Sequence, residues 1–231
     1  MINLYTSFIL SKNGQRNREF ISVLKFNLNL GVFTNIYLIT DENTKCLLNR
    51  NLNSVNLIYI INDERPTFGF MLDLFKPNFV NIISNGDIKF TKTITYAEFI
   101  LTEYNVLTLS RWSVKYKCFP YVEKFTIGNS QDVFGFKGRL PSLIGEFDFF
   151  IGQPACDNKF CYLLSENGYQ LLNVCFDIIT FHVHKNSMIH YDAASCIPPP
   201  YTYIKANFND IFSVIGKLRY YYMLFFVRIF K

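Results

Sequence analysis

The first half of the chain alternates between short runs of apolar residues and stretches in which apolar residues recur at helical spacing. The runs predict strands over Asn3–Leu10, Asn35–Thr40, Asn56–Ile61 and Phe79–Ser84. Helical spacing predicts one helix from Asn17 that stops at Gly31 and another that begins at Pro66. Continuous apolar strands that alternate with helices predict an α/β, Rossmann-like fold with a mainly parallel central sheet.

The second half shows weaker periodicity. It predicts a strand over Asp132–Lys137, a helix over Cys156–Asn167, and two strands around Leu171 and over Asp177–His184. We therefore expect one domain over residues 1–200 and a C-terminal extension over residues 201–231.

The extension ends in a strongly apolar segment, Tyr220–Phe230. Four cations surround it: Lys217, Arg219, Arg228 and Lys231. The segment is shorter than the about 20 residues that a membrane-spanning helix needs. A packing helix, a partner-binding helix and a helix on a membrane surface all remain open.

Composition narrows the class of protein. Half of the 231 residues are apolar and 18% are aromatic, which is enough for a folded core. The net charge of +5 fits a phosphate-bearing ligand or an anionic membrane, whereas the lack of a dense Lys/Arg run argues against nucleic acid. The six cysteines form no C-x-x-C pair and the N-terminus lacks a basic leader, so we expect reduced thiols and a cytoplasmic location, with membrane association left open.

Acidic residues collect just after the predicted strands, at Asp41, Asp63 and Asp87. In open α/β sheets, ligands bind at the carboxyl ends of the strands. The chain contains neither the glycine-rich dinucleotide fingerprint nor the P-loop motif. The sequence therefore predicts a ligand site at this edge without either of those signatures.

Two motifs suggest a divalent cation. In the turn formed by Asn85, Gly86 and Asp87, one carboxylate suits a cation that grips two phosphates, although an ordinary turn has the same sequence. His182 and His184 point to one face of a predicted strand. They suit metal ligation or proton transfer, and a polar outer face of the strand is the alternative.

Three further positions suit group-transfer chemistry. Asp157 stands at a predicted helix start, where it either caps backbone N–H groups or serves as a general base. Asp132 begins a strand, and Arg111 suits a phosphate. The neighbouring Trp112, the only tryptophan, suits either a sugar face or the core.

Taken in order, the segments SNGDI, LSRW, SQDVFGFKG and GQPACDN, followed by FHVH, resemble a family of GT-A-type glycosyltransferase domains. That family occurs in bacterial polysaccharide clusters and large DNA viruses. The resemblance runs from about the first strand to His184 and is strongest from Ser130 onward, and Arg65 in NDERPTF also fits the pattern.

The resemblance implies transfer of a hexosyl or deoxyhexosyl group from a nucleotide sugar to a glycan or glycoconjugate acceptor, with Mn²⁺ or Mg²⁺. Family members usually carry D-x-D, but Asn85 takes the first position here, so Asp87 is the implied metal ligand, with His182 or His184. Asp157 corresponds to the catalytic base of inverting members. The expected nucleotide-sugar residues are Thr6, Asp41, Arg65, Asn85, Asp87, Arg111 and Asp132.

Two other functions remain open. A non-catalytic relative that binds a glycan or a partner would keep the core and lose the metal site, and Asn85 in the acidic motif is compatible with that loss. A nucleotidyltransferase could use the same fold. The segment SKNGQRNR, however, does not match the glycine-rich N-terminal loop of that class.

Overall fold

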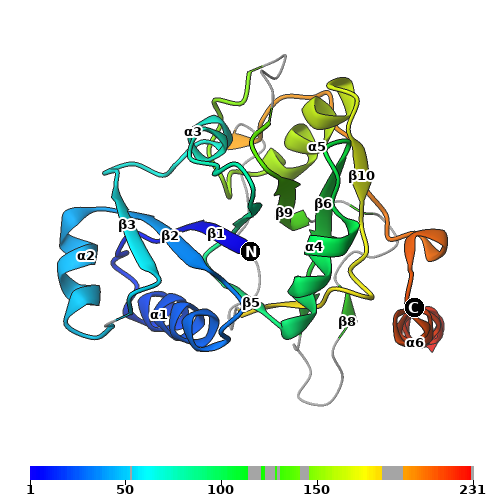
Figure 1. Ribbon diagram of the computed structural model, residues 1–231, viewed down its shortest axis with the longest axis horizontal. Coiled ribbons are helices and arrows are strands. Elements are labelled where there is room, and N and C mark those ends of the chain that lie inside the picture. The colour runs from blue at the N-terminus through cyan, green and yellow to red at the C-terminus, as the bar shows by residue number, and fades with distance from the viewer. Residues whose placement is uncertain are drawn as a thin grey trace.

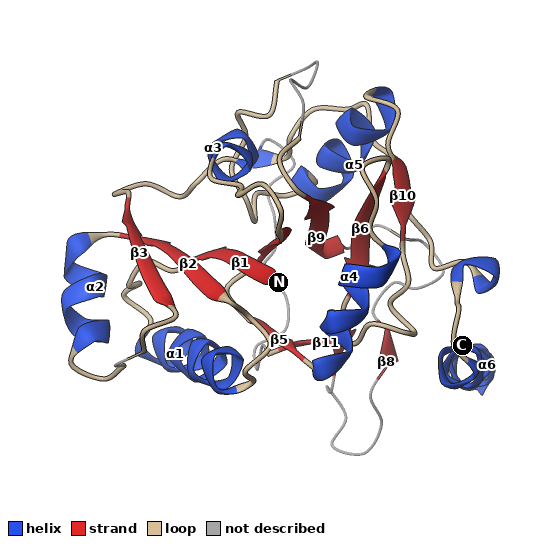
Figure 2. Cartoon of the chain, viewed as in Figure 1, coloured by secondary structure: helices blue, strands red, loops and turns tan. Residues whose placement is uncertain are grey.

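A computed structural model describes residues 1–52, 54–113, 121–122, 128, 131–140, 146–183 and 195–229. Its main feature is a seven-stranded sheet in the order β10-β6-β9-β4-β1-β2-β3 (Figures 1 and 2). The strands are β1 (Ile2–Ser7), β2 (Asn35–Thr40), β3 (Leu57–Ile61), β4 (Val80–Ser84), β6 (Asn105–Ser110), β9 (Gln131–Lys137) and β10 (Gln170–Leu172). Neighbouring strands are parallel except at β9, which runs antiparallel to β4 and β6. The predicted α/β fold with a mainly parallel central sheet is confirmed.

Helices cover both faces of this sheet. In the described residues they are α1 (Gly14–Asn29), α2 (Glu42–Asn49), α3 (Phe68–Asp73), α4 (Ala97–Ile100), α5 (Cys156–Glu166) and α6 (Val214–Ile229), with the 3₁₀ turns η1 (Lys92–Tyr96) and η3 (Phe208–Asp210). Because successive strand residues face opposite ways, Leu4 joins one apolar cluster with Leu24 of α1. Its neighbour Tyr5 joins the other cluster, with Phe68 of α3 and Phe160 of α5.

Side-chain caps set the starts of the helices that follow the parallel strands. Asn13 accepts hydrogen bonds from the backbone N–H groups of Gln15 and Arg16, so α1 begins at Gly14, earlier than the predicted Asn17. Thr67 caps α3 in the same way. These caps fix the helix N-termini near the carboxyl edge of the sheet.

A second sheet of four short strands lies beside the first (Figure 2). Its order is β5 (Ile88–Phe90), β11 (Thr180–His182), β7 (Trp112–Ser113) and β8 (Tyr121–Val122). β11 runs antiparallel to β5, and His182 pairs with Ile88. This pairing brings β11, about 90 residues later in the sequence, next to the turn after β4.

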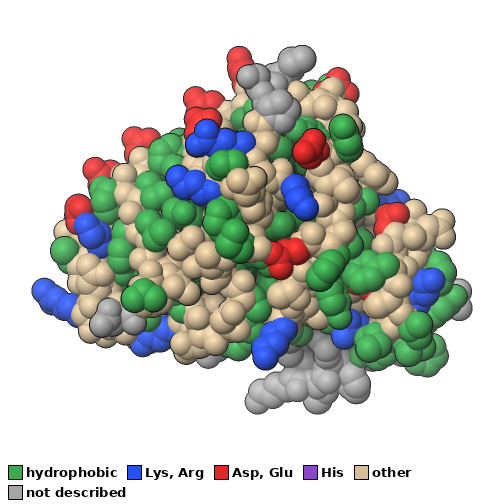
Figure 3. Space-filling view, viewed as in Figure 1, with side chains coloured by type: hydrophobic (Ala, Val, Ile, Leu, Met, Phe, Trp, Pro, Cys, Tyr) green, Lys and Arg blue, Asp and Glu red, His purple; other side chains and the backbone are tan. Residues whose placement is uncertain are grey.

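The C-terminal extension packs on the body. The carboxylate of Asp177 accepts hydrogen bonds from the N–H groups of Phe212 and Ser213 just before α6. Asp177 is therefore not part of a strand, and the strand predicted over Asp177–His184 begins only at Thr180, as β11. Ile211 and Met223 are buried in the core. The opposite side of α6 carries a concentration of apolar side chains on the surface (Figure 3). Among the described residues, no helix combines the length and apolar character needed to cross a bilayer.

Candidate active site

The carboxyl edge of the central sheet gathers polar residues from strands that are distant in sequence. β4 ends at Ser84 and β6 ends at Ser110. The antiparallel β9 lies between them and begins at Gln131, which pairs with Ser110. An antiparallel strand starts at the edge where its parallel neighbours end, so the residues around these three ends meet.

Asp132 is the centre of one polar cluster at this edge. Its Oδ1 accepts a hydrogen bond of 2.6 Å from Nδ2 of Asn85, and its Oδ2 pairs with Nη1 of Arg111 at 2.7 Å. The Asp132 side chain is buried, whereas Arg111 is partly exposed. The structure therefore joins three residues that the sequence predicted separately.

Asp87 is the centre of a second cluster. Its Oδ2 lies 2.5 Å from Nη2 of Arg16 and 3.0 Å from Nε2 of His182. Arg16 also pairs with Glu19, one turn along α1, at 3.3 Å. Burial acts to raise the pKa of Asp87, but hydrogen bonds and positive charge from His182 and Arg16 outweigh it. They hold the pKa well below its usual value, so this buried carboxylate is ionised at neutral pH.

The other carboxylate oxygen of Asp87, Oδ1, is buried and has no hydrogen-bond partner among the described residues. An unsatisfied carboxylate oxygen beside an imidazole is a suitable donor for a divalent cation whose other ligands are phosphate oxygens or water. No group of three or more His, Cys, Asp or Glu side chains placed to hold a metal occurs in the described ranges. A cation here would be held by Oδ1 of Asp87 and completed by phosphate or water, and His182, whose Nε2 is paired with Oδ2 of Asp87, would join it only through its other ring nitrogen. His184 lies outside the described residues.

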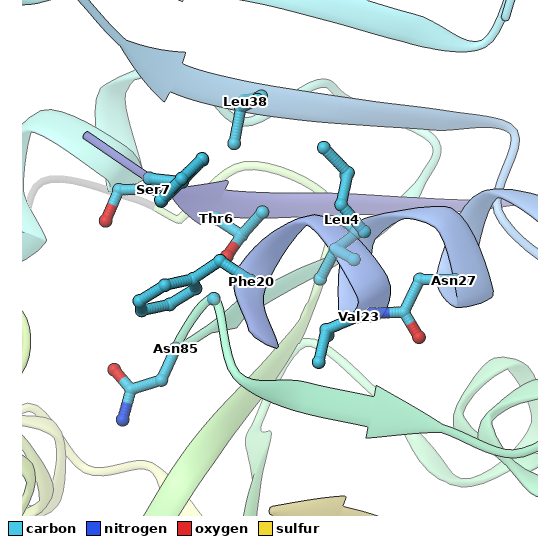
Figure 4. A pocket seen from close by; sticks show the side chains of 11 residues that line it. Leu4, Thr6, Ser7, Phe20, Val23, Asn27, Leu38 and Asn85 are labelled. Carbon is cyan, nitrogen blue, oxygen red and sulfur yellow. The ribbon is translucent and has the colours of Figure 1, made fainter. Parts of the chain in front are cut away.

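Gly86 sets how closely the Asp87 turn approaches β1 and α1. A Cβ at this position would lie 2.6 Å from the carbonyl oxygen of Ser7 and 2.7 Å from the ring of Phe20. Figure 4 shows Phe20 between Thr6 of β1 and the turn that carries Asn85. The hollow here has a volume of ≈ 10 Å³, too small for a nucleotide. Thr6 is buried beneath this layer.

Asp41 and Arg65 lie apart from both clusters. Oδ1 of Asp41 accepts a 2.6 Å hydrogen bond from the N–H of Thr44 and so caps α2. Arg65 is exposed, and a Cβ on Gly152 would lie 3.8 Å from its Nη1. Within the part of the chain that the structure describes, no hydrogen bond or ion pair joins either residue to Asp87 or Asp132.

Asp157 lies in the first turn of α5, after Ala155, whose φ is 66°. Its Oδ1 accepts the N–H of Asn158 and its Oδ2 accepts the N–H of Gln131, each at 3.0 Å. The second bond ties α5 to the start of β9, next to Asp132. Burial, with the negative charge of Asp132 as the second cause, raises the pKa of Asp157 to about 6. A carboxylate with such a pKa suits general base chemistry near neutral pH.

Trp112 belongs to the core. Its side chain is 3% exposed, and its indole N–H donates a 2.8 Å hydrogen bond to the carbonyl of Cys175. Its ring also meets Phe176 edge to face. Of the two interpretations of Trp112, the structure favours the core aromatic.

Arg16 and Glu19 are site residues that sequence reasoning missed. They belong to the segment GQRNRE at the start of α1, where charged residues usually face water. The only available signal was the position of this segment directly after the first strand, at the edge where ligands bind. The backbone N–H of Gln131, which links Asp157 to β9, has no signal in the sequence.

Comparisons with known proteins give a partial similarity of fold. No family model matches the chain, and no curated protein matches it. A protein assigned as a glucose-1-phosphate thymidylyltransferase from Bacillus anthracis has a TM-score of 0.47 and 13% identity, covering 75% of this chain and 87% of that chain. The 4-diphosphocytidyl-2C-methyl-D-erythritol synthase of Anaerococcus prevotii has a TM-score of 0.39 and 13% identity, with 59% and 69% covered. The inositol-1-phosphate CTP transferase of T. maritima has a TM-score of 0.38 and 14% identity, with 58% and 70% covered.

By name, these three proteins are a thymidylyltransferase, a synthase and a CTP transferase. Their TM-scores and identities are too low to carry an argument about activity or substrate.

Proposed function

We propose that this protein is a glycosyltransferase that moves a hexosyl or deoxyhexosyl group from a nucleotide sugar to a hydroxyl of a glycan or glycoconjugate. The observation that carries the proposal is the convergence at one sheet edge of the Asp87 and Asp132 clusters with Asp157. This arrangement supplies the two things that sugar transfer requires. One is positive charge for the departing diphosphate, and the other is a base for the acceptor.

The donor half of the proposed site consists of Asp87, His182, Arg16 and Arg111. A Mn²⁺ or Mg²⁺ ion held by Asp87 and His182 would supply charge to stabilise the diphosphate. The guanidinium of Arg16 is held 2.5 Å from Asp87, and that of Arg111 is held 2.7 Å from Asp132. Both side chains remain partly exposed, so each would present a guanidinium held at a fixed position to the phosphates of the donor.

The acceptor half of the site depends on Asp157. In an inverting transfer, the acceptor oxygen bonds to the anomeric carbon while the bond from that carbon to the diphosphate breaks. The acceptor proton passes to the carboxylate of Asp157, and the electron pair leaves with the nucleoside diphosphate. Each oxygen of Asp157 accepts one backbone N–H and keeps a further lone pair for this proton.

Incubation of the protein with UDP-, GDP- and dTDP-sugars, a panel of glycans and Mn²⁺ tests the proposal. Mass spectrometry should detect a glycan enlarged by one sugar together with free nucleoside diphosphate. A parallel reaction with nucleoside triphosphates and sugar phosphates tests the nucleotidyltransferase alternative. Formation of nucleotide sugar and pyrophosphate in that reaction alone would refute the proposal. Binding of a glycan with no product in either reaction would favour the non-catalytic alternative.

Two arginines of α1, Arg16 and Arg18, provide a matched test of the donor half of the site. Arg16 lies in the Asp87 cluster, whereas Arg18, on the same helix, is exposed. Arg16→Gln should weaken nucleoside diphosphate binding roughly ten- to hundredfold, because a charge-assisted hydrogen bond contributes roughly 1.5–3 kcal/mol. Arg18→Gln should leave the affinity unchanged. Equal effects of the two substitutions would show that only the overall positive charge of α1 matters.

A further inference from the structure

The helix α6 has two contrasting faces. Its inner face packs on the body. Met223 is 1% exposed, Tyr220 meets Phe176 edge to face, and a Cβ on Gly216 would lie 2.2 Å from Oδ1 of Asp177. These contacts fix the rotation of the helix about its axis, and they determine which residues face outward.

The outer face is an exposed apolar stripe. Val214, Leu218, Tyr221 and Phe225 follow one another at helical spacing, with exposures of 74%, 64%, 58% and 65%. Ile215 at 60% lies alongside them. Amphipathic helices usually turn their polar residues toward water, but this one presents apolar side chains on both its inner and its outer face. The stripe forms part of the apolar surface at the lower right of Figure 3.

An apolar groove continues the stripe toward the second sheet. It has a volume of ≈ 370 Å³ and lies between Ile215, Leu218, Arg219 and Tyr222 of the helix region and Trp112, Ile179 and Phe181 of the body. Phe181 precedes His182 on β11, and alternate strand residues face opposite ways. The groove therefore adjoins the strand that carries a proposed site residue, on the other side of that strand.

The charge pattern indicates what the stripe contacts. Residues 213–231 contain four cations and no Asp or Glu. Helical spacing places the exposed Lys217 on one border of the stripe, where its Nζ lies 5.4 Å from the ring of Phe208. Arg219 lies on the other border, beyond Ile215, and its Nη1 donates to the carbonyl of Phe176. An interfacial helix buries apolar residues among lipid chains while flanking Lys and Arg side chains reach anionic headgroups. A second copy of the same helix would instead bring cations against cations.

We propose that α6 docks on the surface of an anionic lipid bilayer through Val214, Leu218, Tyr221 and Phe225. The helix lies in the plane of the headgroups and does not span the membrane. Docking is independent of sugar transfer, so it stands or falls separately from the proposed function. If both hold, the acceptor is presented at a membrane surface.

Sedimentation of the full chain with vesicles tests the proposal. The protein should sediment with vesicles of phosphatidylcholine and phosphatidylglycerol and much less with phosphatidylcholine alone, and added salt should weaken the binding. The double variant Leu218→Glu with Phe225→Glu should lower the partition coefficient roughly tenfold or more, because it places carboxylates among lipid chains. Lys217→Gln should lower it about fivefold on the anionic vesicles, the effect of one lost cation near the surface.

Phe99→Glu is the matched control, since Phe99 is 84% exposed on α4 and belongs to neither the stripe nor the groove. It should bind vesicles like the wild type, and circular dichroism should show all variants folded. No sedimentation of the wild type with either vesicle would overturn the proposal, as would equal effects of the α6 and Phe99 substitutions. Light scattering that shows a wild-type dimer dissociated by Leu218→Glu would assign the stripe to a second copy instead.

Discussion

Replacing Asp157 with Asn separates the two roles that this residue can have. As a first-turn residue of α5, Asp157 accepts the N–H groups of Asn158 and Gln131. As a base, it takes a proton from the acceptor. The first role contributes to stability, and the second to turnover and its pH dependence.

The raised pKa gives a stability signature with a defined sign. The pKa of a free aspartate is 3.8, and that of Asp157 is about 6. The folded protein binds a proton here more tightly than the unfolded chain does, so the stability contributed by protonation is present below pH 4 and lost as the pH rises through about 6. A pKa difference of about two units between the folded and unfolded protein corresponds to about 3 kcal/mol of unfolding free energy. Partial exposure of the side chain reduces this to about 1–2 kcal/mol.

Asn does not titrate, so the variant should lack this loss. The substitution also removes an acceptor for one N–H group, a cost of about 1 kcal/mol or more that does not depend on pH. When urea unfolding of both proteins is compared at pH 4 and at pH 8, this constant cost drops out of the comparison. The difference in unfolding free energy, Asp157→Asn minus wild type, should therefore become more positive by about 1–2 kcal/mol from pH 4 to pH 8.

Turnover should respond differently from donor binding. Wild-type kcat should rise with pH through about 6 as Asp157 loses its proton. Asp157→Asn should cut kcat by about a hundredfold or more, remove that inflection and leave donor affinity nearly normal. Asp148→Asn, at an exposed position before α5, is the control. A folded Asp157→Asn variant with near-normal turnover would refute the base assignment and leave hydrogen bonding at the helix start as its role.

Three further predictions concern the donor site and the extension. Asp87→Asn should weaken metal-dependent nucleotide binding and abolish transfer together, measured by calorimetry and product analysis, because Asn lacks the charge that attracts a cation. Gly86→Ala should destabilise the protein by about 1–3 kcal/mol in chemical unfolding, since its Cβ would meet Ser7 and Phe20 at 2.6 and 2.7 Å. Deletion of the residues after Lys217 should leave nucleotide binding intact, and a folded truncation that no longer binds nucleotide would place the extension in the site.

Much of the first half of the fold could be predicted from the sequence. The run Asn35–Thr40 coincides with β2, and the other apolar runs differ from β1, β3 and β4 only at their ends. β1 and β4 are buried on both faces and β2 largely so, which explains their mostly apolar residues, whereas the edge strand β3 is apolar but partly exposed. β6 was not predicted, although it lies between β9 and β10. In the second sheet, β11 lies within the predicted run Asp177–His184, whereas β5, β7 and β8 are only two or three residues long, too short to show a period.

The site was predicted residue by residue but not as a set of contacts. Asp87 and His182 were both predicted metal ligands, and the structure brings them together. The ion pair between Arg16 and Asp87 could not be predicted, because it joins a charged helix start to a turn 71 residues away. The contact of Arg111 with Asp132 depends on the antiparallel direction of β9, which the apolar pattern of that strand does not encode.

The central claim is that the carboxyl edge around Asp87 binds a nucleoside diphosphate. Calorimetric titration of the protein with UDP, GDP and dTDP, in Mn²⁺ and then in EDTA, tests it most directly. Asp73→Asn, an exposed acid on α3, serves as the control for Asp87→Asn. We expect one of the nucleotides to bind more tightly with Mn²⁺ than with EDTA, in the wild type and in Asp73→Asn but not in Asp87→Asn. Absence of binding for all three nucleotides under both conditions, or binding that Asp87→Asn leaves unchanged, would contradict the claim.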